Sequence, residues 1–471
     1  MVSDDTAPVP LVLDVDGTLL RTDLLLESLW AALGQRPLAA VKAVWRWYGA
    51  PSRLKYELAD IAAPAIDRLP LRSSVLDLAQ EARAAGRDVR LVSGADQRLV
   101  DALAARIGLP GPHFGSTPGH NLTGAAKAAV LMRDFGAGGY DFAGDSAKDL
   151  AAWEGARRIV AVAPPAPLRR RLEATGKPLD LLEDGWRPGT LLRELRPHHW
   201  VKSLLLFLPL VAAGVFDPAA VLAVTLAAVA FSFAASALYI LNDLFDLDAD
   251  RRHPEKWKRP IASGDLPIHV AMTASAVLLA LALVLALAAG PPVAGLVAVY
   301  MALVLVYSLR VKELRWMDVL LLAGLYTLRL VTGGVAAGVS IPPVLLALGF
   351  AVFAALACVK RITALSRIRM PGHLPRRGYS AADLRRLEYL AYIAVGLVPA
   401  LFLFHLAGVG ASVGRHGLLG LSVALITFWL LRFVWLSAKG AEDYDPVQFM
   451  LNDRTGLAIA FAGLVSFLIA V

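Results

Sequence analysis

The sequence predicts a protein of two parts: a Rossmann-like α/β domain with a helical cap, followed by an all-α polytopic membrane domain of nine transmembrane helices. Three observations support this prediction. Short apolar runs typical of buried strands precede polar motifs within residues 1–190. Long apolar runs occupy residues 200–471, and short basic stretches separate them. We place the α/β domain at residues 1–182, a linker at 183–198 and the membrane domain at 199–471.

The composition is typical of a membrane protein. Of the 471 residues, 57% are hydrophobic, and the mean hydropathy is +0.57. The formal net charge is +8, which we attribute to basic loops on the cytoplasmic side, so we expect no nucleic-acid partner. Cys358 is the only cysteine in the sequence, so no disulfide can form within the chain.

The first polar motif follows a strand expected at residues 11–13. The motif reads Asp14-Val15-Asp16-Gly17-Thr18. Ligands of open α/β sheets bind at the carboxyl ends of the strands. Two carboxylates one residue apart at such an end can divide the work, because Asp14 can attack phosphorus while Asp16 donates a proton to the leaving group.

Phosphate-binding groups follow in the next two motifs. A strand expected at residues 89–92 ends in Ser93-Gly94, whose hydroxyl and backbone N–H can hold a phosphate. Lys127 lies near an expected helix start. Its ammonium group can neutralise both the attacking carboxylate and the phosphate.

The fourth motif adds carboxylates. A strand expected at residues 140–143 leads to Gly144-Asp145-Ser146, and Asp149 follows one helical turn later. Together with Asp14 and Asp16, Asp145 can complete an oxygen-rich Mg²⁺ site.

These four motifs, in this order, resemble those of the haloacid dehalogenase-like hydrolase superfamily over about residues 8–180. The resemblance implies that Asp14 is the nucleophile, Asp16 the general acid and base, Ser93 and Lys127 phosphate ligands, and Asp145 a support of the metal. Aspartate at the second position favours a phosphatase over a dehalogenase, because a leaving alkoxide needs a proton.

The resemblance leaves two roles open for Asp149, which can support either Lys127 or the metal shell. It also implies a helical cap at residues 22–75. The cap mixes aromatic with basic residues, which suits either a membrane interface or an ordinary amphipathic helix. These residues are Trp30, Trp45, Trp47 and Tyr48 beside Lys42, Arg46, Arg53 and Lys55.

Nine apolar segments are long enough to be candidate spans, at about residues 200–216, 218–241, 268–289, 292–309, 317–338, 342–359, 388–410, 417–437 and 455–471. The loops on one side hold the basic residues, around 251–259, 310–315, 360–386 and 439–454, whereas those on the other side hold only Arg415. The basic side is cytoplasmic by the positive-inside rule. We therefore expect a multi-pass protein of the inner (cytoplasmic) membrane with its soluble domain on the cytoplasmic side.

An acidic motif ends the second segment. Asn242, Asp246 and Asp250 recur every four residues and would share one face of a helix. They can bind a Mg²⁺ ion and, through it, a diphosphate. Lys258 and Arg259 follow at once and add cations that can bind phosphate.

At this point the chain resembles the UbiA superfamily of intramembrane prenyltransferases over about residues 190–471, and most closely the polyprenyl-phosphate phosphoribosyltransferases. The resemblance rests on RPHHWVKS at 196–203, on the stretch 242–264, on Tyr326-x-x-Arg329 and on Lys360-Arg361. It implies substrate-binding roles for Lys202, Tyr326, Arg329, Lys360 and Arg361, and a catalytic role for Asp246.

One position departs from the general family pattern. Prenyl diphosphate is bound there by a second acidic motif, DxxxD, but here Asp318 is followed by Leu322 at the partner position. One carboxylate cluster with many cations suits a single Mg²⁺-diphosphate and a further phosphate. Phosphoribosyl pyrophosphate has that shape, so the departure favours a phosphoribosyl donor.

The sequence therefore predicts a bifunctional membrane enzyme. It would transfer 5-phosphoribose from phosphoribosyl pyrophosphate to a polyprenyl (decaprenyl) phosphate and then dephosphorylate the lipid-linked product, with Mg²⁺ as cofactor. The alternative is a prenyltransferase that moves a prenyl diphosphate onto an aromatic acceptor, with a regulatory soluble domain or one that acts on another phosphate; a transporter is a further option. The polyprenyl length, the oligomeric state, the true phosphatase substrate and the roles of Asp318 and of the 439–454 loop stay open.

Overall fold

The structure, a computed structural model, describes residues 8–366, 378–408, 413–440 and 453–470. The chain forms two compact units: Met1–Leu195 with Tyr239–Ser275, and Arg196–Leu238 with Ala276–Val471. The predicted membrane domain begins at residue 199 and includes Tyr239–Ser275. In the structure this segment belongs to the same compact unit as the N-terminal domain. Helix α9 (Pro188–Leu195) occupies much of the predicted linker. Most of the 439–454 loop and part of the basic loop after Lys360 lie outside the described residues.

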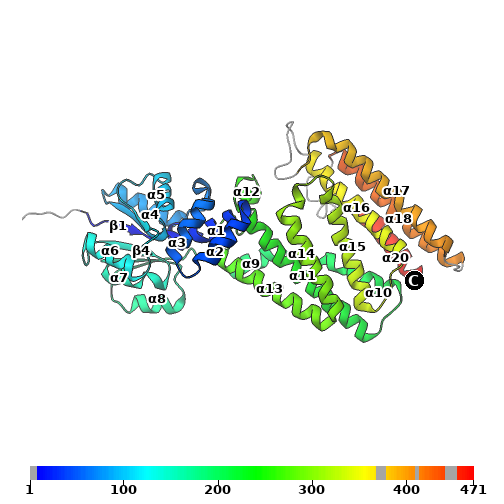
Figure 1. Cartoon of the computed structure of the whole chain (residues 1–471), viewed down its shortest axis with the longest axis horizontal. Coiled ribbons are helices and arrows are strands. Elements are labelled where there is room, and N and C mark those ends of the chain that lie inside the picture. Colours follow the sequence, from blue (N-terminus) through cyan, green and yellow to red (C-terminus); the bar gives the residue numbers. More distant parts are fainter. Residues whose placement is uncertain (1–7, 367–377, 409–412, 441–452, 471) are drawn as a thin grey trace, which may run out of the picture. The chain divides into compact units, whose positions relative to one another are not determined.

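The N-terminal domain is built on one parallel sheet (Figure 1). The strand order is β3-β2-β1-β4-β5-β6, so β1 lies in the middle, between β2 and β4. The bounds are β1 Leu11–Leu13, β2 Val89–Asp96, β3 Phe114–Ser116, β4 Asp141–Gly144, β5 Arg158–Val162 and β6 Leu179–Leu182. The predicted α/β domain is thereby confirmed, and the three predicted strands that precede the motifs are present.

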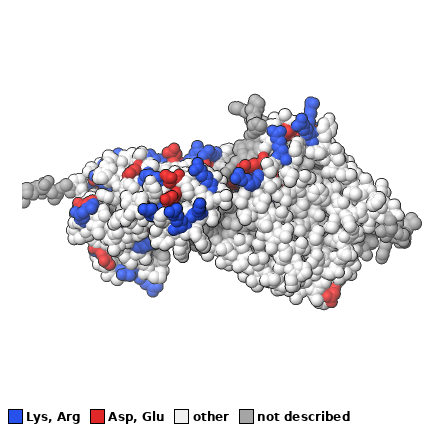
Figure 2. Space-filling model, in the orientation of Figure 1, with Lys and Arg blue, Asp and Glu red and all other residues white. Residues whose placement is uncertain are grey.

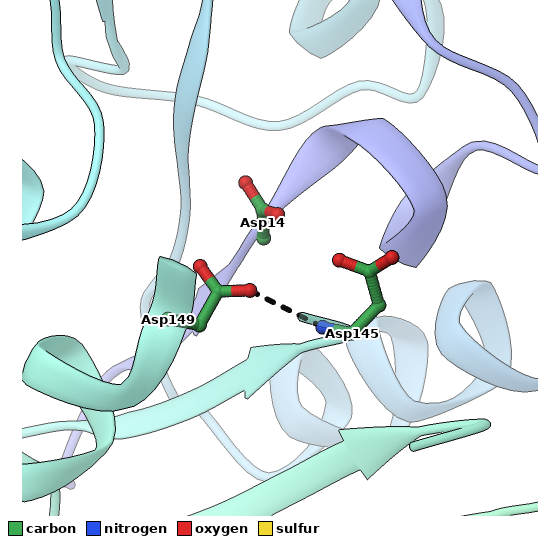
Figure 3. A group of neighbouring side chains, drawn as sticks. All are labelled: Asp14, Asp145 and Asp149. Carbon is green, nitrogen blue, oxygen red and sulfur yellow. Dashed lines mark hydrogen bonds between the residues drawn. The ribbon is translucent and has the colours of Figure 1, made fainter. Parts of the chain in front are cut away.

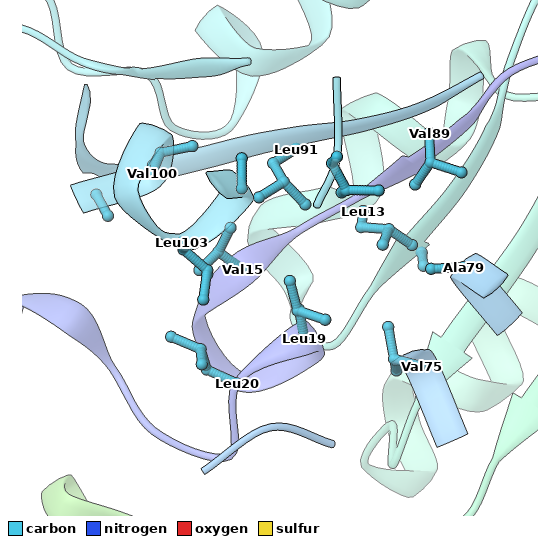
Figure 4. Close-up of a cluster of buried hydrophobic side chains, with 14 of the residues drawn as sticks. Leu13, Val15, Leu19, Leu20, Val75, Ala79, Val89, Leu91, Val100 and Leu103 are labelled. Carbon is cyan, nitrogen blue, oxygen red and sulfur yellow. The ribbon is translucent and has the colours of Figure 1, made fainter. Parts of the chain in front are cut away.

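Successive side chains of β1 point to opposite faces of the sheet, as strand geometry requires. Leu13 packs with Val75 and Leu103 on one face (Figure 4), whereas Val12 packs with Trp153 on the other. The first face is covered by α4 (Ser73–Ala84) and α5 (Gln97–Arg106); the second by α6 (Ala125–Phe135), α7 (Leu150–Gly155) and α8 (Ala166–Glu173). Both faces of the sheet are buried, which leaves the carboxyl ends of the strands as the place for a site.

Three helices between β1 and β2 form the predicted cap: α1 (Leu24–Gln35), α2 (Pro37–Trp47) and α3 (Pro51–Ile61). Prolines open α2 and α3, where the missing N–H would have had no helical partner. Small residues let the helices approach one another closely. Their shared core contains Ala32, Ala40, Ala43 and Leu58.

The membrane region contains seven helices that are long and apolar enough to cross a bilayer, among the residues that the structure describes. They are α11 (Pro218–Phe245), α13 (Ile268–Ala289), α14 (Pro291–Leu309), α15 (Met317–Ala337), α16 (Pro343–Ser366), α17 (Leu384–Gly408) and α18 (Val413–Ala438). Figure 2 shows a broad surface over these helices without Lys, Arg, Asp or Glu. The chain is a multi-pass membrane protein.

Two of the nine predicted spans differ from the prediction. The segment at 200–216 is broken into a helical stretch with 3₁₀ bonding, Pro197–Phe207, and the short α10 (Leu208–Ala212). Pro209 has no N–H to donate, so it is best accommodated in the first turn of a helix, where it lies here. The last segment is α20 (Arg454–Ala470), an apolar helix of 17 residues, which is short for a full span.

Candidate active sites

Three carboxylates meet at the carboxyl ends of the two central strands. Asp14 follows β1, Asp145 follows β4, and Asp149 comes from the turn after it (Figure 3). One ligand oxygen from each lies within 4.8 Å of the others. Asp149 Oδ2 accepts a hydrogen bond of 3.3 Å from the backbone N–H of Asp145, which fixes the turn that brings these residues together.

Lys127, on α6, is the cation of this centre. Its ammonium group donates to Asp14 Oδ1 at 2.8 Å and to Asp149 Oδ1 at 2.7 Å, and the lysine is 4% exposed. Burial alone would lower the pKa of Lys127, but Asp14 and Asp149 outweigh it and raise the pKa. Lys127 therefore stays charged. Of the two roles left open for Asp149, the structure places it on Lys127 while keeping it beside Asp14 and Asp145.

Asp16 lies beside this group but points elsewhere. Its carboxylate accepts hydrogen bonds from the backbone N–H of Leu24 at 2.8 Å and from Ser93 Oγ at 3.2 Å. Burial, with Asp23 and Asp14 nearby, raises the pKa of Asp16 well above its ordinary value. A carboxyl group that holds a proton suits the predicted general acid. The Asp16 side chain, which was predicted to bind the metal, is not one of the three carboxylates of the close group.

The negative charge of the group fits a divalent cation. Burial, together with Asp14 and Asp149, raises the pKa of Asp145 to about 8. Burial raises the pKa of Asp14 to about 6, although Lys127 opposes the shift. Carboxylates held this close need more positive charge than one lysine supplies, and oxygen ligands are those that Mg²⁺ prefers.

The glycine of the first motif is required by the same geometry. Gly17 has φ +76°, and a Cβ atom there would lie 2.2 Å from Asp145 Oδ2. Only glycine adopts this backbone freely and leaves room for the carboxylate. Gly94, predicted to bind phosphate, also lies in a close space, since a Cβ would come 2.6 Å from Thr123 Cγ2.

Sequence reasoning missed two side chains at this site. Lys55, on cap helix α3, donates to the carbonyl of Gly94 at 2.6 Å and to Asn121 Oδ1 at 2.8 Å. Arg72 donates to the carbonyls of Thr18 and Gly17, both at 3.1 Å, and so holds the turn of the first motif. Neither residue lies near a motif in the sequence, so only the fold reveals the contacts.

The acidic segment 242–250 lies in the same compact unit as the α/β domain. Helix α11 ends at Phe245, and α12 (Leu247–Arg252) begins after Asp246. The four-residue register continues across the break, because Asp246 N–H donates to the Asn242 carbonyl at 3.0 Å and Asp250 N–H to the Asp246 carbonyl at 2.7 Å. The backbone hydrogen bonds between residues four apart, which a shared helical face requires, are therefore present across the break.

Arg259 binds into this segment. Its guanidinium group contacts Asp243 Oδ1 at 3.0 Å and Asp250 Oδ2 at 2.6 Å. Burial raises the pKa of Asp250, although Arg259 opposes the shift. Asp243 is 2% exposed and was not among the predicted site residues. Lys258 is exposed. Within the described residues, Asp243, Asp246 and Asp250 do not form a close acidic group like that around Asp14.

The second compact unit contains the predicted substrate-binding residues of the helices. The ring of Tyr326 stacks on that of Phe353, with 5.2 Å between the centroids. Arg329 is 5% exposed and donates to Tyr300 Oη at 2.9 Å. Its guanidinium carbon lies 4.9 to 5.6 Å from the ring centroids of Tyr300, Tyr326 and Phe231.

Arg361 has a partner that explains Asp318. Arg361 Nε lies 2.7 Å from Asp318 Oδ2, and both residues are buried. Arg361 also donates to Tyr307 Oη at 3.0 Å. The lone aspartate at the position of the second acidic motif thus forms an ion pair with Arg361. Lys360, next in the chain, is exposed.

Comparison with known proteins identifies the membrane half. The model of the UbiA prenyltransferase family matches residues 203–452, more than half of the chain. The chain belongs to the UbiA prenyltransferase family. An uncharacterised protein of Sinorhizobium fredii, y4nM, is 34% identical to it over 457 residues, which cover 95% of this chain and 88% of that protein.

A second relative of this UbiA-family chain is a named enzyme. The decaprenyl-phosphate phosphoribosyltransferase of Corynebacterium glutamicum is 32% identical over 292 residues, which cover 60% of this chain and 86% of the relative. A solved structure of substrate-bound phosphoserine phosphatase matches the N-terminal region with 16% identity and a TM-score of 0.27, over 38% of this chain and 94% of that one. The recognition of the membrane half from sequence is confirmed, because residues 203–452 match the UbiA family. The N-terminal half has the parallel α/β sheet that its resemblance to haloacid dehalogenase-like hydrolases implies.

Proposed function

We propose that the chain is a bifunctional enzyme that transfers 5-phosphoribose from phosphoribosyl pyrophosphate to a polyprenyl phosphate and then removes the 5-phosphate from the lipid-linked product. The observation that carries this proposal is the composition of one compact unit, which contains both the centre of Asp14, Lys127 and Asp149 and the acidic segment of the UbiA motif. The similarity to decaprenyl-phosphate phosphoribosyltransferase supports the choice of substrates.

In the transfer step, a phosphate oxygen of the polyprenyl phosphate attacks the anomeric carbon of the donor. The bond from that carbon to the pyrophosphate breaks, and pyrophosphate leaves. We assign Asn242, Asp246 and Asp250 to a Mg²⁺ ion, because their oxygen donors recur at a spacing of four residues. The ion, when bound, would stabilise the negative charge of the leaving pyrophosphate.

Cations of the chain would bind the phosphates of both substrates. In the first unit, Lys258 and Arg259 are assigned to this role, and in the second, Lys202, Arg329 and Lys360. Tyr326, whose ring centroid lies 5.3 Å from the guanidinium carbon of Arg329, would orient the donor. Arg361 is engaged by Asp318, so the exposed Lys360 is the better phosphate ligand of that pair. The same ion pair argues against the alternative of a prenyl diphosphate donor, because Asp318 is not free to hold a second metal.

In the hydrolytic step, Asp14 attacks the phosphorus of the 5-phosphate. The bond between phosphorus and the ribose oxygen breaks, and Asp16 donates the proton that this oxygen needs. Water, deprotonated by Asp16, then releases phosphate from Asp14. Lys127 holds the attacking carboxylate, and Ser93 and Gly94 bind the phosphate oxygens. Mg²⁺ held by Asp14 and Asp145 would neutralise the transferred phosphoryl group.

The order of the two steps follows from the chemistry of the intermediate. The transferred ribose still carries a phosphomonoester, the type of group that the N-terminal domain is built to cleave. Because the lipid keeps the product at the membrane to which this domain is tethered, its effective concentration there is high. We place this domain on the cytoplasmic side of the inner membrane, as the loop charges predict.

One comparison tests the proposal. The purified full-length protein and its Asp14→Asn variant are incubated with Mg²⁺, phosphoribosyl pyrophosphate labelled in the ribose, and decaprenyl phosphate. The wild type should give a dephosphorylated lipid-linked ribose, and the variant an equal amount of lipid that retains its 5-phosphate. Equal phosphorylated lipid from both proteins would refute the hydrolytic role alone. Absence of lipid-linked label, with efficient prenylation of a hydroxybenzoate, would refute the phosphoribosyl reading.

A further inference from the structure

Cap helix α2 presents an apolar face that no described part of the chain covers. Leu38 is 86% exposed, Val41 59%, Trp45 88% and Tyr48, directly after the helix, 84%. Their spacings of three, four and three residues place them on one side of the helix. Ala40 and Ala43 lie on the opposite side, in the core of the cap. The exposed side chains therefore form the outer face of an amphipathic helix whose inner face already packs in the core of the cap.

The chemistry around this face is cationic. Residues 28–56 contain five basic side chains and no Asp or Glu, which gives this stretch a formal charge of +5. Lys42 and Arg46 are exposed on α2 itself. The guanidinium groups of Arg46 and Arg53 lie 5.1 and 4.8 Å from the ring centroid of Trp47. Tryptophan, tyrosine and basic residues around an apolar stripe are the composition of helices that lie in the interface of anionic membranes.

The cap is attached to the end of a membrane-spanning helix within the same compact unit. The ring of Trp30, on α1, packs edge-on against that of Phe245 with 5.0 Å between the centroids, and Phe245 is the last residue of α11. A Cβ on Gly34 would lie 3.7 Å from the Phe245 carbonyl oxygen. Helix α2 begins at Pro37, three residues after Gly34. The start of α2 is thus held close to the end of α11.

We propose that α2 is an interfacial helix that lies in the headgroup layer of the bilayer crossed by the chain's own helices. Its apolar side chains enter the interface, while Lys42 and Arg46 bind anionic lipid phosphates. The 11 residues of α2 extend about 16 Å along the surface. The occupant is the membrane because α2 begins three residues after Gly34, which lies beside the end of α11, and because its charge is opposite to that of an anionic leaflet.

Docking of α2 on the membrane would also position the phosphatase site, a step that rests on the proposed function. Lys55, on the next cap helix, reaches the carbonyl of Gly94 at that site. A cap docked on headgroups would hold the mouth of the site at the level where a lipid presents its phosphomonoester. Loss of docking should then raise the KM for the lipid-linked phosphate and leave the KM for a soluble phosphomonoester unchanged.

Depth-dependent quenching tests the docking without any need for catalysis. The full-length protein is reconstituted in nanodiscs with anionic lipid, and an environment-sensitive fluorophore is attached at Trp45→Cys. Met132→Cys on α6 is the matched control, because it is a large exposed apolar site of the same domain outside the cap. Cys358 is buried, so the wild type serves as the blank for labelling.

Lipids with a spin label near the headgroup should quench the fluorophore at position 45 several times more strongly than that at position 132. Lys42→Glu with Arg46→Glu should abolish this difference, whereas Arg170→Glu with Arg171→Glu, two exposed cations on α8, should preserve it. Equal weak quenching at both positions would overturn the proposal. So would quenching that is absent while position 45 cross-links to a second copy of the chain, because the face would then be a protein interface.

Discussion

Glu27 of cap helix α1 and Arg251 of α12 form a buried ion pair that joins the α/β domain to the acidic segment of the UbiA motif. Two hydrogen bonds connect them, Arg251 Nη2 to Glu27 Oε1 at 2.7 Å and Nη1 to Oε2 at 2.9 Å. The two side chains are 6% and 3% exposed. Glu27 also accepts from Thr22 Oγ1 at 2.6 Å, and Asp16 holds the start of the same helix. One helix thus contacts both the first aspartate motif and the segment with Asp250.

Glu27→Gln should loosen the acidic segment. Removal of one charge of a buried pair costs about 3–5 kcal/mol, since the other charge remains without its partner. We expect trypsin to cleave the variant faster than the wild type at the basic residues of 251–259. Mass spectrometry of the fragments measures this rate. The matched control is Asp248→Asn, which breaks the exposed pair of Asp248 with Arg252 on the same helix and should change cleavage little. Equal cleavage in both variants would show that the buried pair does not hold the segment.

Gly17→Ala should abolish hydrolysis of a phosphomonoester by the N-terminal domain. The new Cβ would collide with Asp145, and the left-handed backbone would add about 1–2 kcal/mol of strain. Gly86→Ala is a matched control, because Gly86 has φ +70° but no atom within 4 Å of the added Cβ. It should show the strain alone, as a slightly lower melting temperature with unchanged turnover of p-nitrophenyl phosphate. An active Gly17→Ala protein would contradict the metal assignment of Asp145.

Lys127→Met should lower the rate of hydrolysis by roughly 10³-fold or more, because the phosphoryl group and Asp14 lose the buried cation that stabilises them. Transfer to the lipid should continue, since this lysine lies in the α/β domain. Lys148→Met, which removes an exposed lysine of the same domain, is the control. One incubation gives both rates, because the total lipid-linked label measures transfer and the ratio of dephosphorylated to phosphorylated lipid measures hydrolysis. A parallel loss of both activities would instead indicate a general folding defect.

Asp246→Ala should abolish transfer and leave hydrolysis of p-nitrophenyl phosphate intact. The reason is the continuous register of Asn242, Asp246 and Asp250, which we assign to Mg²⁺. Asp248→Ala, at an exposed position two residues away, should retain transfer. Wild-type transfer by Asp246→Ala at saturating Mg²⁺ would remove this residue from the site.

The parts of the structure that could be predicted are those that depend on short-range pattern. An apolar run followed by a polar motif predicts a strand end, and Asp14 and Asp145 do follow β1 and β4. Ser93 differs, because β2 continues through it to Asp96. Long-range pairs could not be predicted in this way. Glu27 and Arg251 are 224 residues apart, and Lys55 resembles any basic residue of an amphipathic helix until the cap folds over Gly94.

The membrane half shows the same limit. Hydropathy predicts the seven long helices, but it does not detect hydrogen bonding, so it extends a span across the break before α10. Helical spacing relates Asn242 to Asp246 and Asp250. Asp243 lies off that face, so this spacing does not predict it as a site residue. The structure includes it because Arg259, 16 residues away, binds both Asp243 and Asp250.

Asp318→Asn should reduce stability without changing the dependence of transfer on Mg²⁺. In the general family pattern, an aspartate at this position belongs to a second metal-binding motif. Here Asp318 is 0% exposed, its Oδ2 lies 2.7 Å from Arg361 Nε, and its Oδ1 accepts from Tyr379 Oη at 3.4 Å. Loss of the carboxylate charge leaves the buried guanidinium of Arg361 unneutralised, at a cost of about 3–5 kcal/mol.

The Mg²⁺ activation curve separates the two readings of Asp318. The Asn variant should melt at a lower temperature but reach half-maximal transfer at the wild-type Mg²⁺ concentration, because the metal is assigned to Asn242, Asp246 and Asp250. Asp246→Glu, which keeps the charge but lengthens the side chain, is the positive control and should shift the curve to higher Mg²⁺. If Asp318→Asn shifts the curve as far as Asp246→Glu does, Asp318 is a metal ligand after all. A prenyl diphosphate donor would then regain its main structural support.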